Sequence, residues 1–412
     1  MMKVTDINES PITTITNMNG LTGSEYNILT FKLENVDVSI ANAIRRIILS
    51  EIPCVVIDSL DKQNIEDQKI IINKNNTLLN NEIIKQRLSC IPVCLDYIEC
   101  IQDNNPNSLE LLINKYTEFI NNKKIKLDVR NDQNNKICVT SGDIKIIDKS
   151  DDNEDKEETE RCFKKCTLSD QFIDIVYLEP KYELIGKYEH IMLESDFKIG
   201  YAYENGAYNV ASTCVFTNTI DDIRAEQALK EKMNSIENNQ DITDKNEKDE
   251  LLEVERNDFN NLDRKRIYIP NSFDFKINSI GIYENKDLVK IACFVMMDKL
   301  NKFKNNIESG NNVEITKNFG FTDNCFDIRI EHEDYTLANV LKNMFYVYNY
   351  KNDSETDGIS FIGAKKDHPH EDYIIIRVAY KSEVGDINMI KKEFMNVAQI
   401  CFKVFETINN NF

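Results

Sequence analysis

Residues 31–44 read FKLENVDVSIANAI, and residues 328–341 repeat the pattern as IRIEHEDYTLANVL. Aligned without a gap, the two stretches place Asp37 against Asp334, and an Ala-Asn pair follows four positions later in each. The copies lie about 300 residues apart, far more than the period of about 20–50 residues found in solenoids. The repeat therefore predicts two related modules on one chain, which can pair as the subunits of a homodimer do.

Each copy changes from the periodicity of a strand to that of a helix. Phe31 and Leu33 alternate with charged residues, as Ile328 and Ile330 do in the second copy, which predicts half-buried strands. The polar link that follows contains Asp with Ser or Thr, residues that favour helix N-caps. Beyond the link, one apolar stripe per copy predicts a helix face that needs an apolar partner. The stripes are Ile40, Ile44, Ile47 and Ile48 in the first copy and Leu337, Leu341, Met344 and Phe345 in the second.

A second long helix is predicted in each module. Near the C-terminus, apolar residues are spaced alternately three and four apart, which is a coiled-coil-type seam. A less regular counterpart for the first module lies at residues 287–307. Each stripe alone is also explained as ordinary core, but four helices, two per module, could share one core. The C-terminal seam consists of Ile387, Ile390, Phe394, Val397, Cys401, Val404 and Ile408.

The composition limits the function classes. The 412 residues include 50 basic and 70 acidic ones, for a net charge of −20, and 41% are hydrophobic. This length predicts two or three domains. The acidic balance argues against direct DNA binding and favours either a partner with a basic surface or simple solubility. Eleven cysteines without a regular framework indicate reduced thiols in the cytoplasm. No apolar run suits a signal peptide or a membrane span, so no membrane contact is expected.

Changes in composition and in residue periodicity divide the chain into modules and insertions. Short strand-like runs indicate a β-rich domain inserted in the first module, in which the charged residues 151–160 predict a solvated loop. Residues 220–264 predict a poorly packed charged insertion with an exposed helix from Asp222. The polar residues 1–26 predict a loose end, and residues 310–320 a join. The predicted domains are a first module at 27–95 and 265–309, the inserted domain at 96–219, the charged insertion at 220–264 and a second module at 321–412.

Two signatures resemble those of a known family. Residues 37–53, DVSIANAIRRIILSEIP, resemble the signature of alpha-like subunits of cellular RNA polymerases, which include the bacterial alpha and the archaeal D-type subunits. Residues 87–93, RLSCIPV, resemble the second signature of that family. The second copy, with residues 334–341, 368–370 and 374–378, resembles the smaller, L-type partner found in archaea. These subunits form a heterodimer of two chains, and their fusion in one chain resembles the arrangement in large cytoplasmic DNA viruses.

The resemblance implies an α+β fold and a role in assembly. The fold would contain two alpha-subunit-type dimerisation modules, each with strands and two long helices, paired as an internal pseudo-dimer rather than a homodimer. The chain would be a non-catalytic subunit of a DNA-directed RNA polymerase, without a cofactor, on which the largest and second-largest subunits dock. Its location would be cytoplasmic, in the host cytoplasm and virion if the source is viral.

The resemblance also places a partner site on the first repeat helix. Asn42, Arg45 and Arg46 would face the second-largest subunit. Both arginines fall largely off the apolar stripe, so their guanidinium groups would be available for a carboxylate of a partner. A solvated arginine pair is the alternative. The second copy carries Lys342 and Asn343 at the matching positions, so the platform is predicted to be asymmetric, as two different partners require.

Metal chemistry is the main alternative to assembly. Members of the family often hold a metal or iron–sulfur site on close cysteine pairs, but this chain has no C-x-x-C, and Cys162 and Cys166 are separated by three residues. Residues 199–206 replace the basic, histidine-containing stretch that is usual in the family. The resemblance implies that such a stretch contacts small zinc-ribbon-type subunits, which are further candidate partners. His368 and His370 with adjacent acids leave open a metal-dependent hydrolase or nuclease, or simply a turn before a strand. A third hypothesis is a scaffold of the same fold in another complex.

Overall fold

Two antiparallel sheets with one shared topology form the frame of the chain. In the computed structural model, the first sheet has the strand order β1-β2-β11-β10 and the second the order β12-β13-β15-β14. The first comprises β1 (Lys3–Pro11), β2 (Asn27–Glu34), β10 (Ala211–Ile220) and β11 (Tyr268–Ser279). The second comprises β12 (Val313–Asn318), β13 (Cys325–Glu331), β14 (Ile359–Lys365) and β15 (Tyr373–Tyr380). The structure describes residues 2–11, 27–58, 70–95, 108–166, 169–181, 188–238, 245–318, 320, 324–350, 358–381 and 387–412.

The helices follow the strands in the same order in both halves. A helix comes after the second strand, as α1 (Val38–Ser50) and α8 (Tyr335–Tyr350), and a longer one after the last strand, as α7 (Asn285–Ser309) and α9 (Ile387–Asn409). The repeat predicted from sequence therefore exists as β-β-α-β-β-α in both halves. The first half differs only in its insertions, between α1 and β10 and between β10 and β11.

Local contacts explain why each repeat folds in this way. Asp37 caps α1 by accepting a hydrogen bond from the backbone N–H of Ser39 at 2.8 Å. Asp334 accepts one from the N–H of Thr336 at 2.7 Å and caps α8 in the same manner. The alternating strands also match, because Phe31 pairs with Phe275 across β2 and β11, as equivalent apolar residues pair across β13 and β15.

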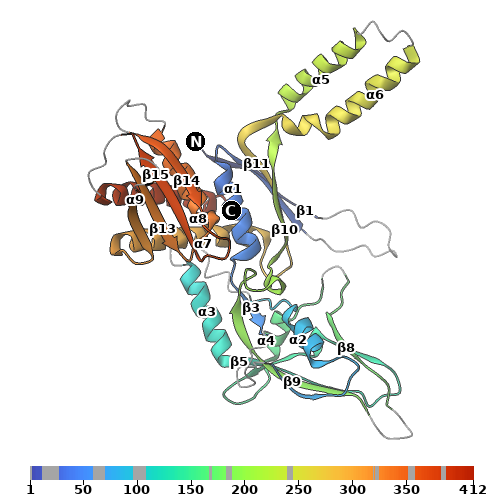
Figure 1. Cartoon of the computed structure of the whole chain (residues 1–412). Helices are drawn as coiled ribbons and strands as arrows, with labels where there is room; N and C mark the ends of the chain where they lie inside the picture. Colours follow the sequence, from blue (N-terminus) through green and yellow to red (C-terminus); the bar gives the residue numbers. More distant parts are fainter. Residues whose placement is uncertain are drawn as a thin grey trace.

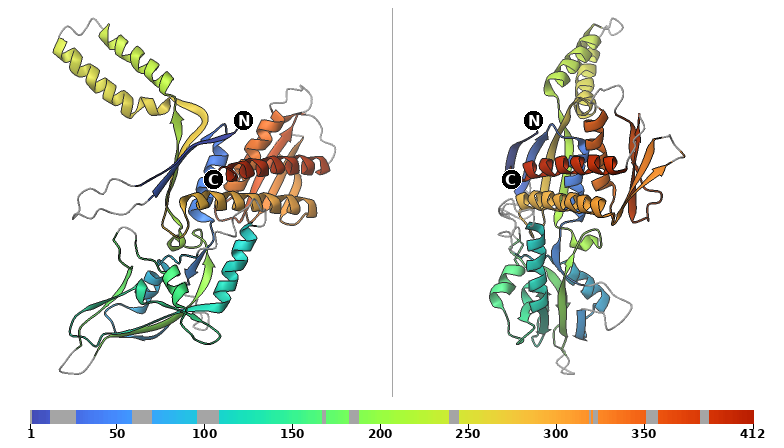
Figure 2. Two further views of the ribbon diagram at one scale, coloured as in Figure 1. Left: turned by 180° about the vertical axis from the view of Figure 1, so that it is seen from behind. Right: turned by 90° about the vertical axis from the view of Figure 1, so that its left-hand side faces the viewer.

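One apolar core lies between the two sheets and their helices. Helices α7 and α9 run side by side (Figure 2). The ring of Phe394 on α9 contacts Phe345 of α8 at 4.5 Å and Phe303 of α7 at 6.4 Å between centroids. The C-terminal Phe412 packs edge-on against Phe31 of the first sheet at 4.8 Å. The rear part of the chain is thus packed on the front part.

Most residues of the predicted stripes are buried, with three exceptions. Met344 is half-buried. In the C-terminal seam Ile387 is exposed, and Phe405 is fully buried while Val404 is half-buried. Phe405 therefore takes the core position predicted for Val404, while Ile408 in the following turn is buried as predicted. The buried members are Ile40, Ile44, Ile47, Ile48, Leu337, Leu341, Phe345, Ile390, Phe394, Val397, Cys401 and Ile408.

An inserted lobe of two further sheets hangs below this core (Figure 1). The larger sheet comprises β3 (Cys54–Ile57), β4 (Ile70–Asn75), β5 (Lys123–Arg130), β7 (Lys145–Asp148) and β9 (His190–Gly200), and the smaller β6 (Ile137–Thr140) and β8 (Asp174–Leu178). This lobe also contains the helices α2 (Asn81–Ser89), α3 (Ser108–Asn122) and α4 (Lys156–Cys162). Short 3-10 turns occur along the chain at η3 (Ser141–Asp143), η4 (Gly206–Tyr208) and η5 (Asp263–Arg266), the last of them between α6 and β11.

Buried tyrosines join the lobe to the core. Tyr283, just before α7, donates a hydrogen bond from its hydroxyl to the carbonyl oxygen of Pro53 at 2.5 Å. The hydroxyl of Tyr116 on α3 lies 2.5 Å from that of Tyr283 and donates to it, since the Tyr283 proton is already used. The lobe is therefore attached through a continuous buried hydrogen-bond chain as well as through the polypeptide.

Strand pairing corrects the predicted domain boundaries. Residues 54–75 are predicted to lie in the first module, but β3 and β4 both pair with β9 of the lobe. Strand β10 is predicted to lie in the inserted domain and instead pairs with β11 of the first sheet. The physical reason is that alternation predicts a strand but carries no information about which distant strand it pairs with.

Two strands and one helix occur where loops are predicted. Strand β1 lies within residues 1–26 and β12 within residues 310–320. Both are edge strands of their sheets and carry mostly polar side chains, so their alternation is weak. Residues 12–26 lie outside the described segments. In the charged stretch 151–160, helix α4 begins at Lys156, because Asp155 caps it by accepting from the N–H of Glu158.

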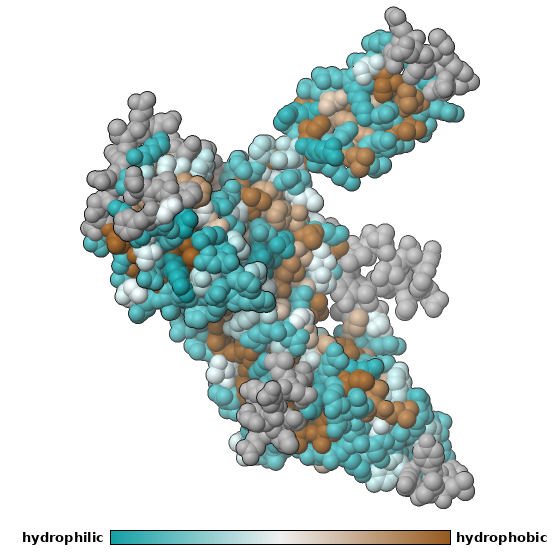
Figure 3. All heavy atoms as spheres, viewed as in Figure 1, coloured by the Kyte–Doolittle hydropathy of each residue, from teal (hydrophilic) through white to brown (hydrophobic). Residues whose placement is uncertain are grey.

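The charged insertion is an ordered two-helix arm, which corrects the expectation of poor packing. Helices α5 (Asp222–Glu237) and α6 (Lys245–Asn261) project from the ends of β10 and β11 (Figure 1). Met233 and Phe259 are buried between the helices, and Lys232 pairs with Glu255 at 2.7 Å. The remaining arm surface is mostly hydrophilic, with apolar side chains in small patches (Figure 3). Among all described helices, none is both long and apolar enough to cross a membrane.

Replacing Phe394 with alanine tests the shared core. The ring is fully buried among α7, α8 and α9, so Phe394→Ala should lower the free energy of unfolding by about 3–5 kcal/mol, measured by urea unfolding followed by circular dichroism. Met389→Ala, at an exposed position of the same helix, should change it by less than about 0.5 kcal/mol. Equal small effects of both variants would contradict a core around Phe394.

Candidate functional site: the clasp between α1 and α8

Polar contacts among Arg46, Asp334, Thr336, Asn343 and Asp37 join the two repeat helices, α1 and α8, and are called the clasp here. One of them is an ion pair. Arg46 on α1 donates from Nε to the hydroxyl oxygen of Thr336 at 2.8 Å, and its guanidinium pairs with the carboxylate of Asp334. Asp334 is at the same time the N-cap of α8. About two fifths of each charged side chain is exposed, 39% for Arg46 and 37% for Asp334, so water screens this pair substantially.

A reciprocal contact lies on the other side of the clasp. Asn343, which occupies in α8 the position of Arg46 in α1, donates from Nδ2 to Oδ1 of Asp37 at 2.8 Å. Asp37 is the N-cap of α1 and the equivalent of Asp334. Each helix thus contacts the cap of the other through the same pair of positions.

A second matching pair of contacts stays within each helix. Arg45 donates from Nε and Nη2 to Oδ1 of Asn42 at 3.0 and 2.8 Å. Lys342 donates from Nζ to Oδ1 of Asn339 at 3.1 Å in the same way. These side chains are half-exposed, as expected for residues off the apolar stripe. The expectation of two available guanidinium groups is wrong for Arg46, whose group is engaged inside the chain, and the partner contact of Asn42, Arg45 and Arg46 stays a prediction.

Lys299 is the charged centre beside this clasp. Its ammonium lies 2.9 Å from a carboxylate oxygen of Glu51, which follows α1, and 2.9 Å from one of Glu333, which precedes α8. The three side chains are largely buried, with 18%, 17% and 16% exposed. Lys299 projects from α7, so one cation ties three helices together. Sequence inspection missed it, because a single lysine in a core helix gives no local signal.

Burial and the paired charges set the protonation of this triad. Burial lowers the pKa of Lys299, but Glu333 and Glu51 outweigh it and hold the pKa above its ordinary value. Burial raises the pKa of Glu333 despite the nearby ammonium. Because the pKa of Lys299 is raised in the folded state, its contribution to stability is complete below the unfolded value of about 10.4. That contribution is lost as the pH rises through the folded value.

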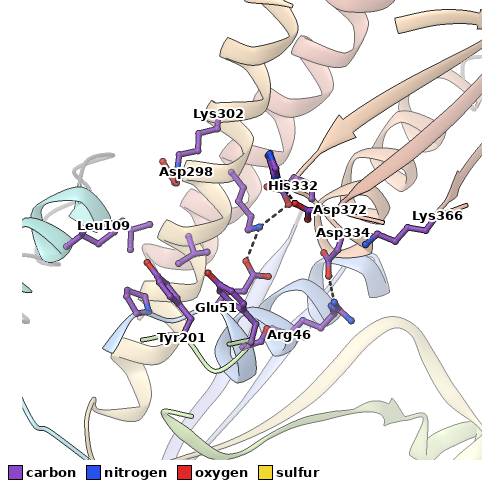
Figure 4. Close-up of a pocket in the computed structure, with 17 residues that line it drawn as sticks. Arg46, Glu51, Leu109, Tyr201, Asp298, Lys302, His332, Asp334, Lys366 and Asp372 are labelled. Atoms are coloured by element: carbon purple, nitrogen blue, oxygen red, sulfur yellow. Dashed lines mark hydrogen bonds and ion pairs between the residues drawn. The ribbon is translucent and has the colours of Figure 1, made fainter. Parts of the chain in front are cut away.

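A cavity of about 670 Å³ opens next to the clasp (Figure 4). Its walls come from α1, α3, α7, the turns before α8 and β15, and the segment after β9. The cavity therefore lies where the helices of the first half, the inserted lobe and the second half of the chain meet. Arg46 and Asp334 of the clasp line it, together with Lys299, Tyr201 and Tyr203.

The predicted metal-site candidates do not assemble a ligand set. His368 and His370 lie in an exposed turn before β15 with their rings stacked at 5.1 Å. Cys162 is fully buried, and burial raises the pKa of its thiol, which disfavours the thiolate that a metal needs. Within the segments given above, no three histidine, cysteine, aspartate or glutamate side chains gather as metal ligands. The hydrolase hypothesis thus gains no support from this geometry.

Comparison with known proteins identifies the family. Residues 30–300, more than half of the chain, match the model of the RNA polymerase Rpb3/Rpb11 dimerisation domain. The chain belongs to this RNA polymerase Rpb3/Rpb11 family. The matched region includes α1 and the first sheet from β2 onward, together with the inserted lobe and the arm, and ends within α7. The second copy lies outside it.

Several relatives of this Rpb3/Rpb11 family member are similar over a short stretch. A subunit 3 of DNA-directed RNA polymerases II, IV and V from Arabidopsis thaliana is 41% identical over 63 residues, 15% of this chain and 17% of the relative. The RNA polymerase II subunit rpb3 of Dictyostelium discoideum is 36% identical over 69 residues, which are 17% of this chain and 20% of the relative. The human RNA polymerases I and III subunit RPAC1 is 33% identical over 72 residues, 18% of each. The chain thus spans about a fifth or less of these relatives.

Replacing Lys299 tests the charged centre. Lys299→Met leaves two largely buried carboxylates without their cation, so the free energy of unfolding should fall by about 3–5 kcal/mol in urea unfolding at pH 7. Lys302→Met removes only an exposed pair with Asp298 one helical turn away and should cost less than about 0.5 kcal/mol. If both variants unfold like the wild type, the triad has no structural importance.

Proposed function

We propose that this chain is a non-catalytic assembly subunit of a multisubunit DNA-directed RNA polymerase, in which two alpha-like modules pair inside one polypeptide. The first module comprises β1, β2, β10 and β11 with α1 and α7, and the second β12–β15 with α8 and α9. The membership of the Rpb3/Rpb11 dimerisation family supports the first assignment. The reciprocal contacts Arg46–Asp334 and Asn343–Asp37 support the pairing, because a pseudo-two-fold dimer requires them.

The proposed domains follow the sheets. The inserted lobe would extend from β3 to β9, and the arm from α5 to α6. The first module would therefore include β10, which lies between these two insertions, as well as β1 at the start of the chain. An internal pair would leave no module free for a second copy, so the chain would be a monomer outside its complex.

The proposed partners are the largest and second-largest polymerase subunits, one for each module. The C-terminal ends of α1 and α8 are equivalent positions of the repeat but differ in chemistry, and this difference supports two different partners. At the end of α1, Tyr203 of the lobe donates its N–H to the carbonyl oxygen of Ser50 at 3.1 Å. At the equivalent position of α8, Tyr346, Val347 and Tyr348 are exposed. Exposed tyrosines beside an apolar residue suit a protein interface.

Catalysis and DNA contact are not part of the proposal. The net charge of −20 disfavours a phosphate backbone as a ligand. Small zinc-ribbon-type subunits remain candidate partners. The fused arrangement makes a large cytoplasmic DNA virus the proposed source, with the polymerase in the host cytoplasm and virion.

Purification of the tagged chain from its native source, followed by mass spectrometry, tests the function. The largest and second-largest polymerase subunits should both co-purify in amounts equal to the chain. A scaffold of the same fold in another complex would instead bring down a set of proteins that contains neither subunit, and that result would refute the proposal.

Charge reversal on each repeat helix should show which helix binds which of the two large subunits. Arg45→Glu should weaken binding of the second-largest subunit about 100-fold or more, because it reverses a charge at a desolvated contact. Its match Lys342→Glu should weaken binding of the largest subunit instead. Neither residue takes part in the clasp, so unfolding should be unchanged within about 0.5 kcal/mol. Normal co-purification of both subunits with both variants would show that these faces are not the docking sites.

A further inference from the structure

The cavity beside the clasp has an aromatic shelf on one wall. The rings of Tyr201 and Tyr203 stack with centroids 5.2 Å apart and an angle of 24° between their planes. The backbone N–H of Tyr203 bonds to the carbonyl oxygen of Ser50, which fixes the shelf on the end of α1. Tyr203 nevertheless has 64% of its surface exposed. A fixed ring pair in a cavity, with one ring exposed, is pre-organised to receive a ligand.

The cations that line the cavity are already engaged. Lys299 bridges Glu51 and Glu333, Arg46 pairs with Asp334, and Lys302 pairs with Asp298 at 2.7 Å. Lys366 donates to the backbone carbonyl of Glu371 at 2.8 Å. An anionic ligand would have to compete with these partners. The cavity therefore offers little attraction to phosphate or carboxylate groups.

Acceptors, in contrast, are in excess on the walls. Five carboxylates face four lysine and arginine side chains among the lining residues. The ion pairs of Glu51 and Asp298 use Oε2 and Oδ2, which leaves their second oxygens as further acceptors. Burial raises the pKa of the Tyr203 hydroxyl, and the negative charges of Glu204 and Glu51 raise it further. The lining thus holds more carboxylate acceptors than lysine and arginine donors.

We propose that the Tyr201–Tyr203 shelf is a binding site for the guanidinium group of an arginine on another polymerase subunit. This inference rests on the proposed function and adds to it the chemistry of one contact. A guanidinium stacks on a tyrosine face and donates in its plane to carboxylates at the same time, which an ammonium does less well. The net charge of −20 favours such a basic partner.

Site-specific photo-cross-linking in the assembled complex tests this site. A benzophenone amino acid at position 203 should cross-link to a peptide of another polymerase subunit that contains an arginine at or within three residues of the attachment point. The same group at position 177, where an exposed tyrosine of the lobe lies on β8 away from the cavity, should not label that peptide. Cross-links only within the chain itself, or only to segments without arginine, would overturn the inference.

Substitution of the same residue gives the second readout. Tyr203→Ala should raise the Kd for the cross-linked subunit about tenfold, whereas Tyr203→Phe, which keeps the ring, should stay within about twofold. Tyr177→Ala is the matched control and should bind like the wild type. If the wild type assembles with the large subunits and Tyr203→Ala binds equally well, the inference fails and the proposed function stands. If the wild type does not assemble at all, both fail.

Discussion

One buried core shared by the front and rear parts of the chain is the constraint on which the rest of the structure depends. Helices α1 and α8 each carry an apolar stripe, and α7 and α9 bury a further row of large side chains. Phe394 illustrates the arrangement, since its ring touches a helix of its own half and one from the other half. Burial of such rings contributes far more to stability than any of the surface ion pairs. The sheets, the lobe and the arm are attached around this core.

The polar contacts beside the core determine how the halves align rather than how strongly they hold. Arg46 and Asn343 reach the caps of opposite helices, so a shift of one helix against the other breaks both contacts at once. The Lys299 triad adds a buried charge group whose desolvation is costly and whose attraction depends on geometry. An apolar core alone tolerates several alignments, whereas these contacts are satisfied in one. The cavity and its tyrosine shelf depend on this alignment, because their walls come from all three parts of the chain.

Local patterns in the sequence predicted much of the fold, and long-range pairing accounts for what they missed. The repeat at Asp37 and Asp334 led to both helix caps and both stripes, and the resemblance of its first copy to alpha-like subunits led to the α+β class. It could not reveal that β3 pairs with β9, since the alternation of residues along a strand does not indicate which strand lies beside it. The polar edge strands β1 and β12 were missed for lack of a clear apolar face. At the site, the position of Arg46 off the apolar stripe was predicted, but its ion pair with Asp334 was not. Neither Lys299 nor the Tyr203 shelf has a sequence signature. The partner contacts of Asn42, Arg45 and Arg46 are still predictions.

The most direct test of the shared core is to cut the chain between its halves. A protease site placed at residues 310–312, between α7 and β12, would separate the first repeat from the whole of the second after folding. The two fragments should stay together as one particle of about 47.9 kDa in native mass measurement and separate only in denaturant. Fragments that separate on cleavage under native conditions would show that the two repeats do not share a core.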